Sequence, residues 1–559
     1  MANEKPKPKL EPELEIEKPL KKDTHPEAEV YKWIRKRRER ERQKPQTPRR
    51  MFEPRRSRAL RSRTKSIAKV SAIPAAERNA LIALYSATNG AGWDNNDNWL
   101  GDPGTEGTWY GIEVQGDHVI GIDLGRNNLT GSLPADLGNL PELRYLALWD
   151  NKIGGSIPIQ LGNLSNLDNL DLSSNQLEGA IPTQLGNLTL LNWLSLGGNN
   201  FPSGPIPSWI QDLTNLQGLD LWDMNLIGEI PAWITSLTNL GHLNFGDNNL
   251  TGSIPDLGSL TNLWWLGLGG NDFTPGSVPS WIQDLTNLDG LNMWDTNRTG
   301  DIPAWLGTLT NLTGINLSGN QLTGSILDLS GLTNLNWLYL GGNPFDSGPI
   351  PSWIQGLNSL NYLSLWNTNR TGEIPAWIGT MTSLRWLELD SNQLEGSIPV
   401  QVGSLSNLEG LGLSDNQFTA SIPNLVSLGN LRWLNLGGNP FDPGPIPSWI
   451  QSMPSLDDIN LWTTNRTGNV PAWMGSLTNL RNLWLGNNRL EGSIPPQIGD
   501  LARLENLDLG NNQLTGSLPT DLGDLTSLRR LSLGGNPFNP GPIPTWIQSL
   551  PNLESLDMW

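Results

Sequence analysis

The sequence predicts an α/β repeat solenoid: a curved superhelix with a parallel β-sheet on its concave face and short helical turns and loops on its convex face. A period near 24 residues runs from Val119 to the end of the chain. Leucines recur at the same places in each unit, and a Gly and Pro segment follows them. Such a period indicates a repeat array, because one unit cannot bury its own leucines and needs stacked neighbours. We count eighteen complete units and a nineteenth that begins at Leu553.

The residues of one unit predict its local structure. The unit that starts at Leu167 reads LDNLDLSSNQLEGAIPTQLGNLTL. Its leucines at the first, fourth and sixth places alternate as in a short strand with one buried face. Asn175, at the ninth place, can donate and accept hydrogen bonds inside the turn and so satisfy buried backbone groups. The G-x-I-P segment predicts the return path, and L-G-x-L predicts a short helical turn.

The consensus L-x-x-L-x-L-x-x-N-x-L-x-G-x-I-P-x-x-L-G-x-L resembles the plant-type leucine-rich repeat (LRR) of receptor-like kinase ectodomains and polygalacturonase-inhibiting proteins. The segment 76–122, with its Ala80–Leu84 helix and Trp93, Trp99 and Trp109, resembles the N-terminal cap of that family. The plant cap normally carries a cysteine pair, and this chain has no cysteine, so it is more similar to a cysteine-free bacterial or protist variant. The resemblance implies a helical cap at residues 73–118 and an array of repeats over residues 119–559.

Charge divides the chain near residue 72. Residues 1–72 carry 23 Lys and Arg against 11 Asp and Glu, whereas the remainder carries 14 against 44. The first segment has few large apolar residues, so we expect a disordered basic arm. Only this arm is considered for binding to nucleic acid or an anionic membrane, and a linking or solubilising role is favoured over both. The acidic body should attract cationic partners.

Several function classes have little support. The absence of cysteine excludes a disulfide framework, a thiolate zinc site and a cysteine nucleophile. The three histidines, His25, His118 and His242, are far apart in the sequence, so we expect no metal, no cofactor and no enzyme activity. No apolar run of 18 residues predicts a transmembrane segment.

The two ends of the chain leave the localisation open. The first twenty residues lack the apolar core of a signal peptide. A cytoplasmic protein is therefore the default expectation, and an extracellular or cell-surface one applies if the N-terminus is mis-assigned. The chain stops at Trp559, seven residues into a unit, so we expect a fragment of a longer protein.

Tryptophan is the unusual residue, with 26 copies. Nine of them lie two residues after the proline of the return path, and we expect these to be structural and to stack on the next unit. They are Trp209, Trp233, Trp281, Trp305, Trp353, Trp377, Trp449, Trp473 and Trp546.

A second class of aromatic residues occupies the third, fifth and seventh places of the units. Strand alternation directs the third and fifth places away from the leucines. We therefore expect an exposed aromatic row on the concave face, where large rings offer contact area at low entropic cost. His242, at a third place, is expected to be exposed there too. The candidate binding residues are Tyr145, Trp149, Trp193, Trp222, Trp265, Trp294, Trp337, Tyr339, Tyr362, Trp366, Trp386, Trp433, Trp462 and Trp484.

The function favoured by the family resemblance is non-enzymatic recognition of a protein or peptide through the concave face. One alternative is a carbohydrate-binding surface protein or adhesin, in which the aromatic row stacks on sugar rings. Another is a structural scaffold without a dedicated ligand. In that case the aromatic residues are a by-product of block duplication and pack on one another.

Overall fold

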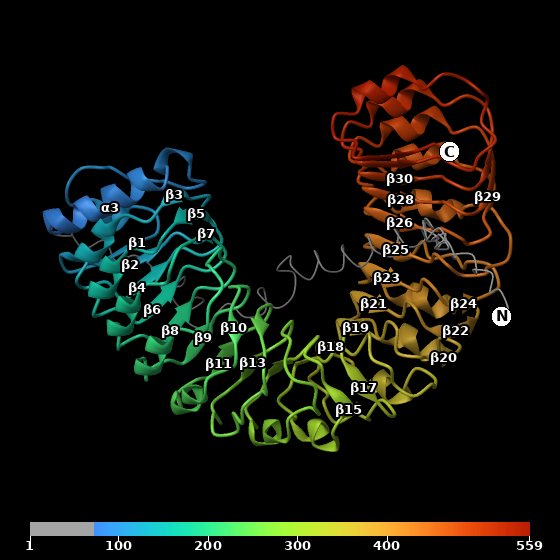
Figure 1. Ribbon diagram of the computed structural model, residues 1–559. Coiled ribbons are helices and arrows are strands. Elements are labelled where there is room, and N and C mark those ends of the chain that lie inside the picture. Colours follow the sequence, from blue (N-terminus) through green and yellow to red (C-terminus); the bar gives the residue numbers. More distant parts are fainter. Residues whose placement is uncertain (1–71, 559) are drawn as a thin grey trace, which may run out of the picture. The chain divides into compact units, whose positions relative to one another are not determined.

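The computed structural model describes residues 72–558, and the fold below is that of this part of the chain (Figure 1). The chain divides into two units, residues 1–69 and 70–559, and all described residues belong to the second. The basic arm that the sequence predicts over residues 1–72 lies outside the described residues, apart from its last one. Between residues 72 and 558, no helix has the length and apolar character needed to cross a bilayer.

One sheet of 20 strands runs along the whole array. The strand β1 comes from the cap and pairs antiparallel with β2, whereas every later neighbour pairs in parallel. Each of the nineteen units contributes one strand, which confirms the predicted parallel sheet. The strands are β1 (Ile112–Gln115), β2 (His118–Asp123), β4 (Tyr145–Ala147), β6 (Asn169–Asp171), β8 (Trp193–Ser195), β9 (Gly218–Asp220), β11 (His242–Asn244), β13 (Trp265–Gly267), β14 (Gly290–Asn292), β16 (Gly314–Asn316), β18 (Trp337–Tyr339), β19 (Tyr362–Ser364), β21 (Trp386–Glu388), β23 (Gly410–Gly412), β25 (Trp433–Asn435), β26 (Asp458–Asn460), β28 (Asn482–Trp484), β30 (Asn506–Asp508), β32 (Arg530–Ser532) and β33 (Ser555–Asp557).

The predicted helical turn of the return path is a five-residue 3-10 helix, and a proline precedes each one. Proline holds φ near −65° and lacks an N–H, so it begins such a turn without losing a hydrogen bond. Three units of 23 residues, which start at Leu240, Leu312 and Leu408, lack this helix. The helices are η3 (Ala135–Asn139), η4 (Ile159–Asn163), η5 (Thr183–Asn187), η6 (Ser208–Asp212), η7 (Ala232–Ser236), η8 (Ser280–Asp284), η9 (Ala304–Thr308), η10 (Ser352–Gly356), η11 (Ala376–Thr380), η12 (Val400–Ser404), η13 (Ser448–Ser452), η14 (Ala472–Ser476), η15 (Pro496–Asp500), η16 (Thr520–Asp524) and η17 (Thr545–Ser549).

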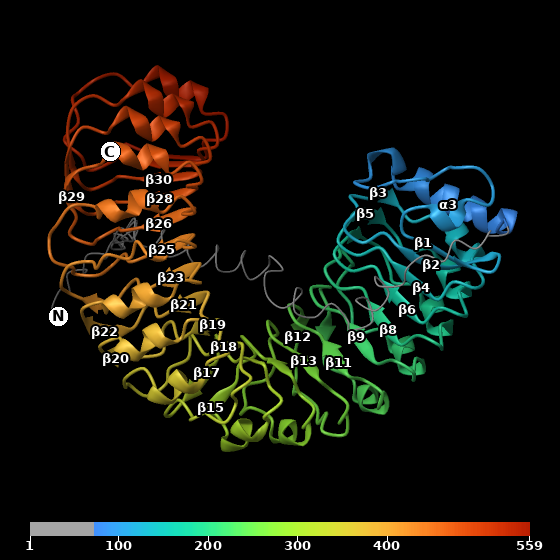
Figure 2. The same ribbon diagram turned by 180° about the vertical axis from the view of Figure 1, so that it is seen from behind.

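Short parallel sheets join the turns that follow the main strands. In the C-terminal arm of the array the main-sheet strands lie on the inner side and the short strands on the outer side, as both views show (Figures 1 and 2). The short strands are β3 (Thr130–Ser132), β5 (Lys152–Gly155) and β7 (Gln176–Leu177); β10 (Ile227–Gly228) and β12 (Asn249–Leu250); β15 (Thr299–Asp301) and β17 (Gln321–Thr323); β20 (Thr371–Gly372), β22 (Gln393–Gly396) and β24 (Gln417–Phe418); and β27 (Thr467–Asn469), β29 (Arg489–Gly492) and β31 (Gln513–Leu514).

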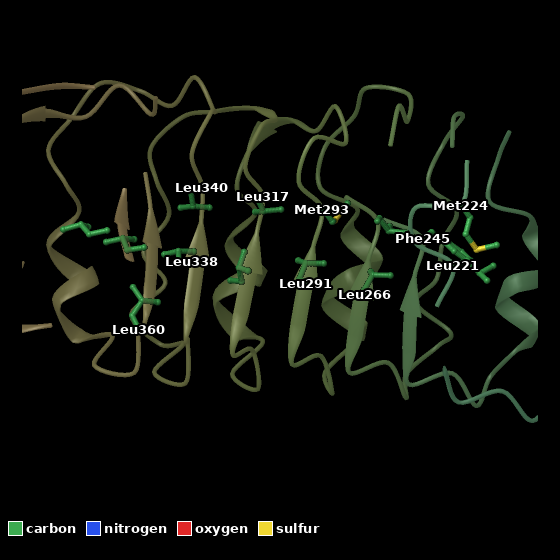
Figure 3. Close-up of a cluster of buried hydrophobic side chains, with 14 of the residues drawn as sticks. Leu221, Met224, Phe245, Leu266, Leu291, Met293, Leu317, Leu338, Leu340 and Leu360 are labelled. Carbon is green, nitrogen blue, oxygen red and sulfur yellow. The ribbon is translucent and has the colours of Figure 1, made fainter. Parts of the chain in front are cut away.

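The leucines of successive units form one continuous core. The fourth place of each unit is the central paired residue of its strand. From β2 to β32 the residue at this place is at most 1% exposed. Figure 3 shows Leu266, Leu291 and Leu338 in a row that crosses neighbouring strands. Each fully buried leucine contributes about 1.5–3 kcal/mol relative to an exposed one, so the row stabilises the array only while the units stay stacked.

The ninth-place asparagine joins each unit to its neighbours on both sides. Asn175 Nδ2 donates to the carbonyl of Leu172 in its own unit (3.1 Å) and of Leu148 in the preceding unit (2.9 Å). Its Oδ1 accepts the N–H of Ile153 at 3.0 Å. This confirms the predicted role of the asparagine. The same three contacts recur at Asn199, Asn248, Asn271, Asn320, Asn343, Asn392, Asn416, Asn439, Asn488, Asn512 and Asn536.

Three of the four units without this asparagine use a threonine and a buried arginine instead, and the fourth has the buried Met224 at this place. The hydroxyl of Thr296 donates to the carbonyl of Met293 at 2.7 Å. Two places later Arg298, only 4% exposed, donates from Nε to the carbonyl of Thr296 (2.9 Å) and from a terminal nitrogen to that of Thr274 (2.5 Å). Burial lowers the pKa of this arginine. Thr368 with Arg370, and Thr464 with Arg466, repeat the arrangement.

The cap closes the N-terminal end of the core without a disulfide. Its helix α3 (Ala75–Ala87) is followed by η1 (Gly90–Gly92) and η2 (Glu106–Thr108). Tyr85, Trp93, Trp99 and Trp109 form a chain of ring contacts with centroids 5.3, 4.9 and 5.0 Å apart. The three tryptophans are at most 9% exposed. The predicted helical cap is therefore confirmed, and aromatic packing holds it together.

We predict that Asn175→Ala destabilises the array by about 1–3 kcal/mol, because it leaves the buried N–H of Ile153 without its partner. It also removes one of the two asparagine donors to each of the carbonyls of Leu148 and Leu172. Asn175→Thr should cost less, since Thr296 shows that a hydroxyl keeps the contact with the carbonyl three residues earlier. The free energy of unfolding in urea measures both. Equal losses for the two variants would contradict the role given to the side-chain contacts.

Candidate binding face of the main sheet

The third and fifth places lie on the face of the main sheet opposite the leucine core, as strand alternation requires. The expectation that the fourteen candidate residues are exposed there is wrong. Four are buried: Trp265 is 5% exposed, Trp337 6%, Trp462 5% and Trp484 6%. The others are half-buried, namely Tyr145, Trp149, Trp193, Trp222, Trp294, Tyr339, Tyr362, Trp366, Trp386 and Trp433.

The third-place rings are covered because glycines in the adjacent strands make room for them to lie flat. Gly218 pairs with Trp193, and a Cβ at Gly218 would lie 2.0 Å from a carbon of that indole. A Cβ at Gly314 would lie 1.7 Å from the ring of Trp337. The same arrangement places Tyr145 over Gly121, Trp265 over Gly290 and Trp386 over Gly410.

The seventh-place tryptophans, which come just after the main-sheet strands, also pack on glycines of a neighbouring unit. Each ring covers a glycine of the preceding unit, and a Cβ there would approach within 2.2 or 2.3 Å of the ring. The pairs are Trp149 with Gly125, Trp222 with Gly197, Trp294 with Gly269, Trp366 with Gly341, and Trp462 with Gly437. These rings therefore extend the covered aromatic surface beyond the strand ends.

In the middle of the array the rings join into one aromatic strip. His242 is central to it, with its ring centroid 5.1 Å from that of Trp193 and 6.1 Å from that of Trp265. Trp265 then contacts Trp337 at 6.1 Å, across the two glycine-bearing strands β14 and β16. We define the aromatic strip as Trp193, His242, Trp264, Trp265, Trp337, Tyr339 and Tyr362.

Two members of the strip were missed as site residues. His242 was expected to be an exposed lone histidine, but it is 7% exposed. Its ring also lies 5.2 Å from that of Trp264, which occupies a second place, outside the strand alternation. The glycines at the third place of nearby units are the signal in the sequence that could have revealed the flat packing.

Several candidate residues lie outside the strip. Trp386 and Trp433 stack on each other, with centroids 5.9 Å apart. The hydroxyl of Tyr145 donates to Glu113 at 2.7 Å, and burial together with this carboxylate raises the pKa of Tyr145. The fourteen candidates are thus not one continuous row.

Buried polar atoms that have no hydrogen-bond partner lie in the strip and in residues on or next to the strands that it crosses. They are both ring nitrogens of His242, Oδ1 of Asn292, Oδ1 of Asn336 and Nε1 of Trp337. All four residues fall between β11 and β18. An unpaired buried polar group costs about 1–3 kcal/mol. Asn435 Oδ1 and Trp546 Nε1 are unpaired in other units, but four such residues between β11 and β18 form the larger group and need a reason.

Charged residues at the second place of the C-terminal units form ion pairs. At the second place of successive units, arginine alternates with an acidic residue. Arg432 contacts Asp457 at 2.8 Å and Arg481 contacts Glu505 at 2.5 Å, and Arg385 with Glu409 and Arg529 with Glu554 continue the pattern. These pairs are partly exposed, and each contributes about 0–1 kcal/mol.

Asp508 is a buried carboxyl on the same face. It is 8% exposed, and its Oδ1 accepts the N–H of Gly510 at 2.9 Å. Burial raises the pKa of Asp508 to about 6, and the backbone hydrogen bond opposes that rise. Near neutral pH the carboxyl is mostly ionised, and its burial makes the ionised form less stable in the folded protein than in the unfolded chain.

The nine return-path tryptophans pack against the core from the other side of the array. Trp209 is 9% exposed and belongs to the core, and the remaining eight are half-buried against it. This agrees with the structural role expected for them. Among residues 72–558, however, their contacts are with the aliphatic core and no two of them form a ring pair.

Family models of leucine-rich repeats match several stretches of the chain. The leucine-rich repeat region matches residues 122–226, and further leucine-rich repeat models match 334–357, 383–405, 430–453 and 478–538. The solved structure of a TDR receptor is similar at 31% identity over 78% of this chain and 84% of that one, with a TM-score of 0.55. This chain belongs to the leucine-rich-repeat family.

Other similar leucine-rich-repeat structures are plant receptors solved with ligands. One is the Arabidopsis receptor kinase HAESA in complex with the peptide hormone IDA and the co-receptor SERK1. It is 30% identical over 87% of this chain and 94% of that one, with a TM-score of 0.54. Another is the plant peptide hormone receptor RGFR1 in complex with RGF2, which is 30% identical over 78% and 82%, with a TM-score of 0.51.

We predict that Gly314→Ala lowers the free energy of unfolding by about 1–3 kcal/mol, because the added methyl group overlaps the ring of Trp337. Gly356→Ala is the matched control, since a Cβ there meets no atom within 4 Å. Urea denaturation measures both. Two equally mild effects would contradict the flat packing of the indole on the strand.

We predict that Asp508→Asn stabilises the protein near pH 7 and has little effect near pH 4. The folded-state pKa of about 6 lies above the ordinary value of 3.8, so the carboxyl lowers stability as pH rises through this window. Two pKa units correspond to about 3 kcal/mol, which is the upper bound on the gain. The difference in unfolding free energy between variant and parent, measured from pH 4 to pH 8, should grow with pH. A difference that is flat with pH would refute the assignment.

Proposed function

We propose that this protein is a non-enzymatic recognition module that binds a peptide or an extended protein segment along the aromatic strip. The segment would lie across β8 to β19 on the face opposite the leucine core. It would contact half-buried rings at the two ends, Trp193 and Tyr362, and reach the polar atoms between them.

The observation that carries this proposal is the set of unpaired buried polar atoms in the strip. Trp337 Nε1 is a donor without an acceptor, whereas Asn292 Oδ1 and Asn336 Oδ1 are acceptors without a donor. A peptide backbone presents N–H and C=O groups alternately, so one extended segment offers partners of both kinds. A bound peptide that covers the rings would add apolar contact. The rings would lose little conformational entropy, because the sheet already holds them flat.

The similar receptors support a peptide over other ligands. HAESA is solved with a peptide hormone, and RGFR1 is described as a peptide hormone receptor. Both share the repeat architecture at 30% identity. A non-enzymatic role is favoured because the strip offers aromatic rings, with the amides of Asn292 and Asn336 close to it.

Carbohydrate binding remains the second candidate, because flat, half-buried indoles such as that of Trp193 also suit the faces of sugar rings. A scaffold without a ligand is the third. The unpaired polar atoms favour the first two over the third, since a pure scaffold gains nothing from them.

The test is selection of binders from a random twelve-residue peptide library against the full chain, alongside a glycan array. We predict that selected peptides bind the parent and lose at least tenfold in affinity when Trp193 and Tyr362 are both replaced by alanine. The control is the double variant Trp233→Ala and Trp305→Ala, which removes half-buried tryptophans on the other side of the array. Trp265 and Trp337 are left intact, because they are buried and their loss would test stability as well.

Urea denaturation of both double variants separates lost binding from lost folding. Binding of glycans instead of peptides, with the same sensitivity to the first double variant, would replace the first candidate with the second. Peptide binding that is unaffected by the first double variant would place the site elsewhere. If neither peptides nor glycans bound, a scaffold without a ligand would be favoured.

A further inference from the structure

The middle of the array is almost without positive charge. Between residues 153 and 384, Asp and Glu occur seventeen times, whereas Lys and Arg occur only as Arg298 and Arg370. The aromatic strip lies entirely within this stretch. The parts of the array on either side are different: residues 73–152 contain four Lys and Arg, and residues 385–559 contain eight.

The two arginines of the central stretch are occupied within the fold. Arg298 and Arg370 are each 4% exposed and donate to backbone carbonyls, including those of Thr296 and Thr368. Burial lowers the pKa of both. Both guanidinium groups are therefore engaged within the fold. This stretch of the sequence has seventeen acidic residues and no Lys or Arg besides these two.

One carboxylate lies directly beside the strip. Asp220 lies at the end of β9, with a side chain 16% exposed. Its Oδ1 accepts a hydrogen bond from Asn244 Nδ2 at 3.0 Å, and Oδ2 lies 3.8 Å from His242 Nε2, beyond hydrogen-bond distance. No Lys or Arg among residues 72–558 contacts this carboxylate.

The histidine beside it is unsatisfied as well. Both nitrogens of His242 lack a hydrogen-bond partner, although the ring is 93% buried among Trp193, Trp264 and Trp265. With the proton of a neutral imidazole on Nδ1, Nε2 is an acceptor. Two acceptors of different kinds, Nε2 and the Oδ2 of Asp220, then stand 3.8 Å apart with no donor between them.

We propose that the ligand is a basic peptide and that an arginine side chain of it binds between Asp220 and His242. A guanidinium carries five N–H donors in a planar fork, so one group can donate to both acceptors at once. Its flat face can also lie against the half-buried indoles of Trp193 or Trp264, where a cation is attracted to the ring. The surrounding excess of carboxylates raises the rate at which such a peptide approaches.

This inference rests on the proposed function and adds the chemical class of the ligand. The C-terminal carboxylates of the same face fit less well. Glu409, Asp457 and Glu505 already have arginine partners at the second place. Asp220, near the middle of the array, has no such arginine partner among residues 72–558.

The test measures the affinity of the full chain for fluorescent twelve-residue peptides at about physiological ionic strength, roughly 150 mM salt. One peptide carries arginine at every third position in a Gly and Ser background, and its matched partner carries the neutral isostere citrulline. We expect the arginine peptide to bind at least tenfold more tightly than the citrulline peptide. We also expect Asp220→Asn to weaken the arginine peptide at least tenfold and to leave the citrulline peptide unchanged.

Asp284→Asn is the matched control, because it removes the same charge from the exposed end of η8, away from the strip. It should change the affinity by less than twofold. His242→Phe keeps the ring contacts and removes both nitrogens, and it should weaken only the arginine peptide. Asn at position 220 can still accept the hydrogen bond from Asn244, and urea denaturation checks that each variant is folded.

The outcomes separate this inference from the proposed function. Equal binding of the two peptides, or equal effects of Asp220→Asn and Asp284→Asn, would overturn the arginine site. If neutral library peptides still bound and still depended on Trp193 and Tyr362, the proposed function would stand without it. If no peptide of any charge bound, both would fall.

Discussion

The whole array depends on the hydrogen bonds that the ninth-place asparagine makes across units. A leucine stack alone would tolerate sliding, because apolar contact has no direction. Asn175 ties carbonyls of two units and the N–H of one to a single side chain, so that each unit is held in one register against the next. That regularity makes every other place in the unit recur at the same position on the face of the sheet. Where Thr296 and Arg298 take over, the contacts change but the register does not.

Constant register also explains how large rings fit on a sheet of closely spaced strands. Adjacent strands lie about 4.8 Å apart, which is less than the width of an indole. A ring such as that of Trp337 can lie flat only if the next strand presents no side chain, and Gly314 meets that condition. The alternation of aromatic and glycine units therefore belongs to one packing arrangement. It produces a rigid, covered aromatic surface in place of a row of projecting side chains.

The sequence was sufficient for the strand positions, the ladder asparagine, the cap and the core, because all of these repeat within a single 24-residue unit. The same reasoning chose the right face for Trp265 and Trp337 but predicted the wrong exposure. Alternation along one strand says which face a side chain leaves from, and burial depends on the residues of neighbouring strands. His242 was missed for the same reason: its surroundings come from rings some 23 to 49 residues away in the chain. Unit-by-unit comparison of third-place residues would have shown the glycines.

The centre of the array shows a trade between stability and recognition. Along most of the array, buried polar groups are satisfied by contacts within and between units, as Asn175 illustrates. Charges at the second place pair between units in the C-terminal part, as Arg432 illustrates. In and beside the strip, His242, Asn292, Asn336 and Trp337 keep unpaired atoms. The stretch of sequence that contains them is rich in acidic residues and poor in Lys and Arg. Each of these features reduces stability by itself. A stack of many units can bear such losses because its stability is nearly a sum over units and interfaces. Long arrays can therefore keep a locally unsatisfied surface ready for a partner that supplies the missing donors, acceptors and charge.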